Sequence, residues 1–149
     1  MDLRFEEKST FYVSGYPMET SEASLEKDCA RLREQYEDKL RSVSDHLYFV
    51  AYMEKEGTMT YLLCVETTSL TPATEGASCK EIPATRRAVV TVPEGASVLA
   101  TWYKFFEMFE KEAPALKGAA IDMVYPFHIE SFDENGACEL WIPVVKSEV

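Results

Sequence analysis

The sequence predicts an α+β domain with an antiparallel sheet and two main helices, built as a tandem pseudo-two-fold repeat of strand-helix-strand-strand units. Each half of the chain shows the same order: a run rich in β-branched and aromatic residues, a segment of helical periodicity, and then two further runs of the first kind. When the sequence is aligned with itself at a constant offset, the offset that places Gly57 on Gly136 also places Val13 on Val92 without a gap. Each half alone cannot cover its own apolar surfaces, so we expect the two halves to pair about a pseudo-two-fold axis.

The first half opens with a strand predicted over residues 9–16, "STFYVSGY", and closed by Gly15 and Pro17. A helix of about 20 residues is predicted within residues 20–43, because apolar side chains recur there every three or four positions. The buried stripe of this helix consists of Leu25, Cys29, Leu32, Tyr36, Leu40 and Val43.

Two strands, at residues 46–54 and 58–67, complete the first half. Both are rich in β-branched and aromatic residues, and Glu56-Gly57 between them is typical of a hairpin turn. The polar stretch over residues 68–81 is interpreted as a linker or loop.

The second half repeats this order. A strand is predicted over residues 86–92, and Ser97 is suited to the N-cap of a strongly aromatic helix that ends before Pro114. A final hairpin is predicted over residues 127–144. Its turn is placed at Asn135-Gly136, because Asn-Gly between apolar runs is the strongest short hairpin signal.

Length and composition favour a single globular domain. The chain has 149 residues and a mass of 16.9 kDa, which allows a core without disulfides or metal. We expect one domain over residues 1–149, with the first repeat over about 9–67, the linker over about 68–81 and the second repeat over about 82–146. No apolar run approaches the roughly 18 residues of a membrane span, and the N-terminus lacks a secretory or transit pattern, so a cytoplasmic location is expected.

Charge and cysteine content exclude several classes of function. The formal net charge of −11 repels phosphate backbones and anionic lipids, so direct binding of nucleic acid or membrane is not expected. The four cysteines are scattered, with no C-x-x-C pair, and are interpreted as reduced thiols. We therefore expect no metal and no cofactor, and the oligomeric state stays open.

Glu130, in the middle of an apolar strand, is the main candidate for function. If Asn135 and Gly136 are the two loop residues, Glu130 lies opposite Trp141 and shares its face with Phe132. The equivalent face of the first hairpin is predicted to carry no charge: Phe49, Ala51, Met53, Thr60, Leu62 and Cys64. One carboxylate among aromatic and aliphatic side chains is typical of a pocket for an apolar cation.

An alternative accounts for the same glutamate without a ligand. Glu130 could lie at a wet edge of the sheet, or pair with an arginine such as Arg86 or Arg87. The pattern of residues alone leaves both interpretations open.

Two stretches of the second half carry a family resemblance. "IPATRRAVVTVPEGASVLATWYKFFEMF" followed by "HIESFDENGACELWIPV" resembles the GyrI-like (gyrase-inhibitor-like) small-molecule-binding family, also described as the AraC-type effector-binding domain, of the SOUL-like fold superfamily. With the first half, the resemblance covers roughly residues 9–146, and the family fold is a tandem pair of strand-helix-strand-strand units. In multidrug-responsive members, the glutamate at the position of Glu130 attracts lipophilic cations. Phe132 replaces the usual tyrosine and removes its hydroxyl.

The resemblance implies a stand-alone or excised domain that binds a drug-like, amphipathic molecule, a class that includes cations, in sequestration or ligand sensing. Many relatives are fused to a helix-turn-helix domain, which this chain lacks; a protein partner such as gyrase or a regulator stays open. Glu130 would supply the charge, and the proposed walls and neighbours are Trp141, Phe132, Phe49, Trp102 and Tyr125. Trp102 could instead be an ordinary core residue, and Tyr125 could simply fill a strand edge.

Two other functions are considered. In a hydrolase of cyclopropane-containing or related electrophilic xenobiotics, Glu130 would activate water, with Tyr125 or Tyr52 assisting. In a haem protein His128, on the Glu130 face, could ligate the iron, but a lone histidine without a second cue is usually a polar surface residue. The other histidine, His46, lies where a loop meets the following strand.

Overall fold

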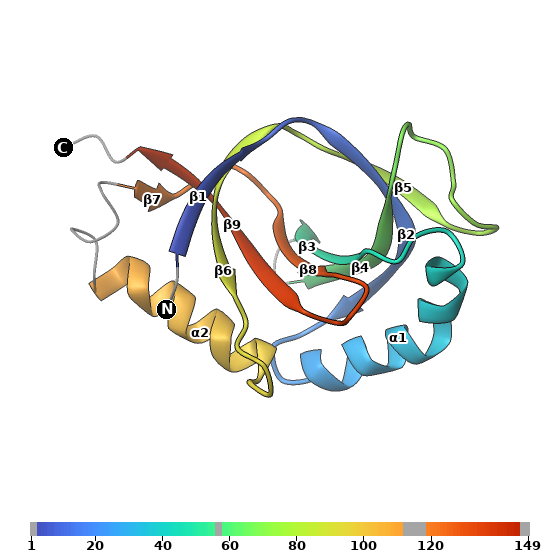
Figure 1. The fold of residues 1–149 in the computed structure, drawn as a ribbon, viewed down its shortest axis with the longest axis horizontal. Helices are drawn as coiled ribbons and strands as arrows, with labels where there is room; N and C mark the ends of the chain where they lie inside the picture. The colour runs from blue at the N-terminus through green and yellow to red at the C-terminus, as the bar shows by residue number, and fades with distance from the viewer. Residues whose placement is uncertain (1–2, 56–57, 112–118, 147–149) are drawn as a thin grey trace.

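The computed structural model describes residues 3–55, 58–111 and 119–146. It confirms the predicted α+β class, with an antiparallel sheet and two helices (Figure 1). In chain order the elements are β1 (Leu3–Lys8), β2 (Phe11–Thr20), α1 (Leu25–Arg41), β3 (Leu47–Lys55), β4 (Thr58–Thr67), β5 (Ser78–Ile82), β6 (Thr85–Thr91), α2 (Val98–Lys111), β7 (Ala119–Ile121), β8 (His128–Phe132) and β9 (Cys138–Lys146).

The sheet has the strand order β1-β6-β9-β8-β3-β4-β2-β5, and β7 pairs with β9. This order is symmetric about its centre, where β3 of the first hairpin pairs with β8 of the second. Phe49 of β3 lies directly opposite Glu130 of β8. The two hairpins therefore form one continuous surface at the middle of the sheet.

Both helices lie on the same side of the curved sheet, and their N-terminal ends face each other near its middle (Figure 1). Leu32 and Leu40 of α1 and Phe105 of α2 are buried in the same core as Phe49 and Leu140 of the sheet. A second apolar cluster fills the opposite face of the sheet, and its aromatic members are Phe11, Tyr48, Tyr52, Phe127 and Trp141.

The predicted helices are confirmed, with small differences at their ends. The first is 17 residues long and ends at Arg41, so Val43 lies beyond it and is exposed. The second begins as predicted, because the Ser97 hydroxyl accepts a hydrogen bond from the amide of Ala100 at 3.2 Å. Neither helix in the described part of the chain is long and apolar enough to cross a membrane.

Three strands were not predicted: β1, β5 and β7. Residues 78–81, interpreted as part of a linker or loop, belong to β5, which extends the sheet beyond β2. Polar side chains gave no period-two signal there, because an edge strand needs little apolar surface.

The expected end of the first strand at Gly15 and Pro17 is also wrong, since β2 continues to Thr20. Gly15 lies so close to β4 that an added Cβ would be 1.9 Å from the carbonyl oxygen of Leu63, so the glycine permits close packing and does not form a turn. Pro17 lies beyond the last residue of β2 that pairs with β5, where an open edge tolerates a residue without an N–H group.

The turn between β8 and β9 differs from the prediction by one residue. Its loop contains Glu134, Asn135 and Gly136, closed by hydrogen bonds from Asp133 N to Ala137 O and from Gly136 N to Asp133 O, both 3.0 Å. Gly136 has a φ of 82°, as in a type I turn followed by a left-handed residue. The Asp133 carboxylate accepts hydrogen bonds from the amides of Asn135 and Ala137, at 2.8 and 2.9 Å, which favours the longer loop.

This extra loop residue changes the register of β9. Glu130 pairs with Leu140, whereas Trp141 pairs with Ile129. Because strand side chains alternate between faces, a shift of one residue moves each β9 side chain to the other face. The prediction that Trp141 lies opposite Glu130 is therefore wrong, and the two side chains lie on opposite faces of the sheet.

The first hairpin contains a similar shift. Its predicted turn residues Glu56 and Gly57 lie outside the described residues. Lys55 pairs with Thr58, but an irregularity between Met53 and Lys55 brings Met53 opposite Met59. The face that carries Phe49 therefore presents Tyr61 and Leu63 from β4, and not the predicted Leu62 and Cys64.

Candidate functional site

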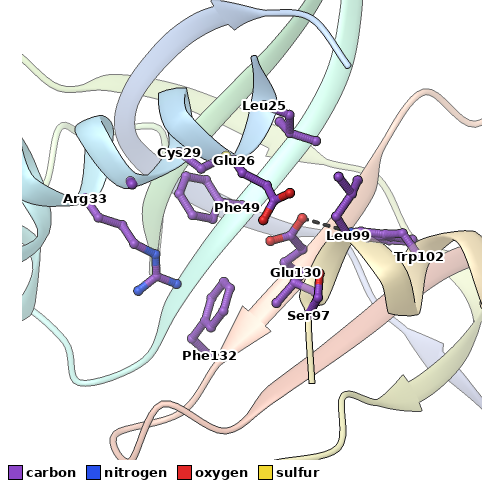
Figure 2. A pocket seen from close by; sticks show the side chains of 12 residues that line it. Leu25, Glu26, Cys29, Arg33, Phe49, Ser97, Leu99, Trp102, Glu130 and Phe132 are labelled. Carbon is purple, nitrogen blue, oxygen red and sulfur yellow. Dashed lines mark hydrogen bonds between the residues drawn. The ribbon is translucent and has the colours of Figure 1, made fainter. Parts of the chain in front are cut away.

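A cavity of about 350 Å³ lies between the two helices and the centre of the sheet (Figure 2). Four elements supply its main walls: Cys29 and Arg33 from α1, Leu99 and Trp102 from α2, Phe49 from β3, and Glu130 and Phe132 from β8.

Glu130 forms the polar centre of this cavity and is only 6% exposed. Its Oε2 atom accepts a hydrogen bond from the Trp102 indole nitrogen at 2.9 Å. The Tyr61 hydroxyl also favours the ionised form of the carboxylate. Burial raises the pKa of Glu130 to about 7, although Trp102, the charge of Arg33 and Tyr61 act in the opposite direction. The group therefore exchanges its proton near neutral pH.

The two alternatives for Glu130 are wrong. Its burial excludes a wet sheet edge. Arg87 pairs with Glu6 at 2.9 Å and lies over the ring of Trp141, on the other face of the sheet, and Arg86 lies over Phe5. No lysine or arginine within the described ranges forms an ion pair with Glu130.

Arg33 places a positive charge in the same cavity. Its guanidinium carbon lies 4.1 Å from the centre of the Phe132 ring and 5.3 Å from that of Phe49. Its Nη1 atom donates a hydrogen bond to Glu37 at 2.7 Å. The π faces of both phenylalanines are thus already in contact with a cation of the protein.

A second cavity of about 280 Å³ adjoins the first and shares Leu25, Leu99 and Trp102 with it. His128 lines it and stacks against Trp102, with ring centres 6.1 Å apart. Burial lowers the pKa of His128, so its ring is neutral at neutral pH. Tyr61 also lines this space, and burial keeps its pKa above the ordinary value, so its hydroxyl stays protonated.

Four of the six predicted ligand-binding residues meet at the first cavity: Glu130, Phe132, Trp102 and Phe49. Trp141 and Tyr125 do not, because both belong to the opposite face. Trp141 packs against Tyr48, and the Tyr125 hydroxyl donates a hydrogen bond to the carbonyl of Pro83 at 2.5 Å. The binding of a ligand by the four clustered residues stays a prediction.

The residues considered for other functions are separated in the same way. Tyr52, expected to assist Glu130, packs against Phe127 on the opposite face. The Nε2 atom of His46 lies 2.6 Å from the Ser131 hydroxyl oxygen, and its ring stacks on Tyr48. His128, in contrast, lies on the same face of the sheet as Glu130 and lines the second cavity. No group of three or more potential metal ligands gathers within the part of the chain that the structure describes.

Sequence reasoning missed Tyr61 and Arg33. The irregularity between Met53 and Lys55 rotates Tyr61 onto the face of Glu130, and no sequence signal marks it. Arg33 could have been found, because it lies one helical turn after Cys29 on the stripe that faces the sheet.

Comparisons with known proteins agree on the type of fold. The family model Cass2, described as integron-associated effector binding protein, matches residues 4–144. The structure described as SAV2435 bound to tetraphenylphosphonium superimposes with a TM-score of 0.73 at 14% identity, covering 97% of this chain and 94% of that one. The search of curated proteins finds no match.

Two further solved structures are similar. The integron cassette protein VCH_CASS2 from the mobile metagenome of Vibrio cholerae has a TM-score of 0.71 at 16% identity, over 96% of this chain and 95% of that one. The C-terminal domain of EcmrR has a TM-score of 0.59 at 13% identity, over 97% and 98%. At such low identity these structures show that the fold is shared.

Proposed function

This chain belongs to the family of integron-associated effector-binding proteins, and we propose that it binds an amphipathic, aromatic and cationic small molecule at Glu130. The bound molecule would be sequestered or sensed, in the cytoplasm and without direct contact to nucleic acid. The buried carboxylate of Glu130 inside an aromatic cavity is the observation that carries this proposal.

The electrostatics of the site favour a cation. A buried carboxylate costs several kcal/mol unless it is paired or hydrogen-bonded. Trp102 and Tyr61 are neutral groups that favour the ionised carboxylate, but burial outweighs them, since the pKa of Glu130 is raised to about 7. A ligand cation next to Glu130 would lower this cost, because opposite charge stabilises the ionised carboxylate.

The shape of the site favours an aromatic ligand of moderate size. The two adjoining cavities, about 350 and 280 Å³, together fall in the range of small-molecule sites. Their walls are mainly apolar, and Leu25, Leu99 and Trp102 line both. The tetraphenylphosphonium bound by the structurally similar SAV2435 is a lipophilic aromatic cation, which supports this ligand class.

Calorimetric titration with tetraphenylphosphonium tests the proposal. We expect saturable binding to the wild-type protein at pH 8, and a loss of at least tenfold in affinity for Glu130→Gln, which keeps the shape of the side chain but removes its charge. Glu134→Gln is the matched control, because it removes one negative charge from an exposed position on the same hairpin. Equal losses in both variants, or no binding to the wild type, would contradict the proposal.

One observation favours a second candidate, a hydrolase of strained electrophilic xenobiotics. A carboxylate with a pKa of about 7 beside a protonated tyrosine is suited to general-base activation of water. Tyr61 would then replace Tyr125 and Tyr52 in the assisting role. Incubation with a cyclopropane-containing electrophile tests this: turnover above buffer should be lost in Glu130→Gln, and a rate equal to buffer would exclude that substrate.

A further inference from the structure

We propose that the cavity contains a second subsite, at Arg33, which binds an anionic group, so that the preferred ligand is an aromatic zwitterion. Its cationic centre would lie at Glu130 and a carboxylate, or a comparable anion, would lie at Arg33. This inference rests on the proposed function, because it concerns the ligand class of the same cavity.

The guanidinium of Arg33 is accessible and only partly neutralised. Its side chain is 29% exposed and lines the cavity together with Glu130. Its one ion-pair partner within the described ranges is Glu37, which also lies 3.7 Å from a guanidinium nitrogen of Arg41. One carboxylate thus serves two guanidiniums, which leaves positive charge and unused N–H donors on Arg33.

Packing holds this charge in place. The guanidinium lies over Phe132 and close to Phe49, so its position is fixed by two rings as well as by Glu37. A pre-positioned guanidinium can donate two parallel hydrogen bonds to a carboxylate at little entropic cost.

The cavity is therefore polarised. Glu26 and Glu130 are acidic groups on its lining, and Arg33 is its basic group (Figure 2). Arg33 and Glu130 do not form an ion pair with each other. A simple cation would bind Glu130 but be repelled by Arg33, whereas a zwitterion of matching orientation would satisfy both charges.

Two triphenylphosphonium probes of equal aromatic content test this inference. Butyltriphenylphosphonium carries only the cation, and (4-carboxybutyl)triphenylphosphonium adds a carboxylate at the end of a similar chain. We expect calorimetry at pH 8 to show that the carboxylated probe binds the wild type about fivefold more tightly, which is a reasonable size for a partly exposed ion pair. The methyl ester of the same probe should lose this advantage, and this comparison needs no variant.

Variants locate the effect. Arg33→Gln should abolish the preference for the carboxylated probe, while Arg31→Gln, the same charge change at an exposed position of α1, should retain it. Equal binding of the ester and the acid to the wild type would overturn the inference while leaving the proposed function intact. The same conclusion would follow if Arg31→Gln reduced the preference for the carboxylated probe as much as Arg33→Gln does. If no probe binds, both proposals fail.

Discussion

Trp102 of α2 donates a hydrogen bond from its indole nitrogen to Glu130 of β8 at 2.9 Å, which links a helix to the centre of the sheet inside the candidate site. The bond favours the ionised form of Glu130, while burial of the same carboxyl favours the protonated form. The balance of the two effects places the titration of Glu130 near neutral pH.

Removal of this donor should therefore raise the pKa of Glu130. In Trp102→Phe the carboxylate loses a hydrogen bond but stays buried, so we expect the pKa to rise above 7. Carboxyl carbon-13 NMR over a pH series would measure it. Trp141→Phe is the control, since that indole lies on the opposite face of the sheet, and an equal rise in both variants would contradict the assigned role.

Stability should fall as pH rises through the range in which Glu130 ionises. The pKa of its carboxyl is about 7 in the folded protein, against an ordinary value of 4.5 that applies to the unfolded chain. Between these two pH values the folded protein therefore binds more protons than the unfolded chain. The full cost, of the order of 3 kcal/mol, is therefore present above pH 7 and absent below pH 4.5.

Urea unfolding at pH 5 and pH 8 would measure this difference. Glu130→Gln cannot ionise at this position, so it should be more stable than the wild type at pH 8 and show a smaller loss between the two pH values. The exposed Glu134→Gln should behave like the wild type. If the free energy of unfolding of the wild type, relative to that of Glu130→Gln, increased from pH 5 to pH 8, the raised pKa would be contradicted.

Binding of a cation should release a proton from Glu130 below pH 7. A cation favours the ionised carboxylate. Below pH 7 the Glu130 carboxyl of the free protein is protonated, so binding must also remove this proton, and the free energy of that step weakens the observed binding. We expect the affinity for tetraphenylphosphonium to fall by up to about tenfold per pH unit below pH 7 and to level off above it. Calorimetry in buffers of different ionisation enthalpy would count the released protons, and affinity that is independent of pH between 5 and 8 would exclude Glu130 as the group that binds the cation.

Gly15 should be irreplaceable in β2. A Cβ atom at this position would lie 1.9 Å from the carbonyl oxygen of Leu63, so Gly15→Ala must separate β2 from β4. We expect a loss of more than about 3 kcal/mol or failure to fold. Gly95→Ala, where an added Cβ meets open space but φ is 78°, should cost only about 1 kcal/mol. Similar losses in urea unfolding would show that contact with β4 is not the cause.

The class of fold and both helices could be predicted because apolar periodicity reports which side of an element faces the core. The burial of Glu130 could not be decided in this way, since a glutamate within an apolar strand fits a wet edge as well as a pocket. The register of the hairpins could not be predicted either, because it depends on single residues near each turn. The Asn135-Gly136 signal correctly located a turn, but Asp133 binds the amides of Asn135 and Ala137 and lengthens the loop to three residues. That one residue decides that Trp141 lies away from Glu130.

Asp133 should therefore contribute measurably to the stability of the β8–β9 hairpin. Asp133→Ala removes the acceptor of two backbone hydrogen bonds, at 2.8 and 2.9 Å, and we expect a loss of about 1–2 kcal/mol in urea unfolding. Asp133→Asn keeps a carbonyl oxygen that can accept the same bonds, so it should recover most of the loss. Glu134→Ala, an exposed substitution in the same loop, should change stability by less than about 0.5 kcal/mol. If Asp133→Ala were as mild as Glu134→Ala, the three-residue loop, and with it the position of Trp141, would be determined by the packing of β9 and not by Asp133.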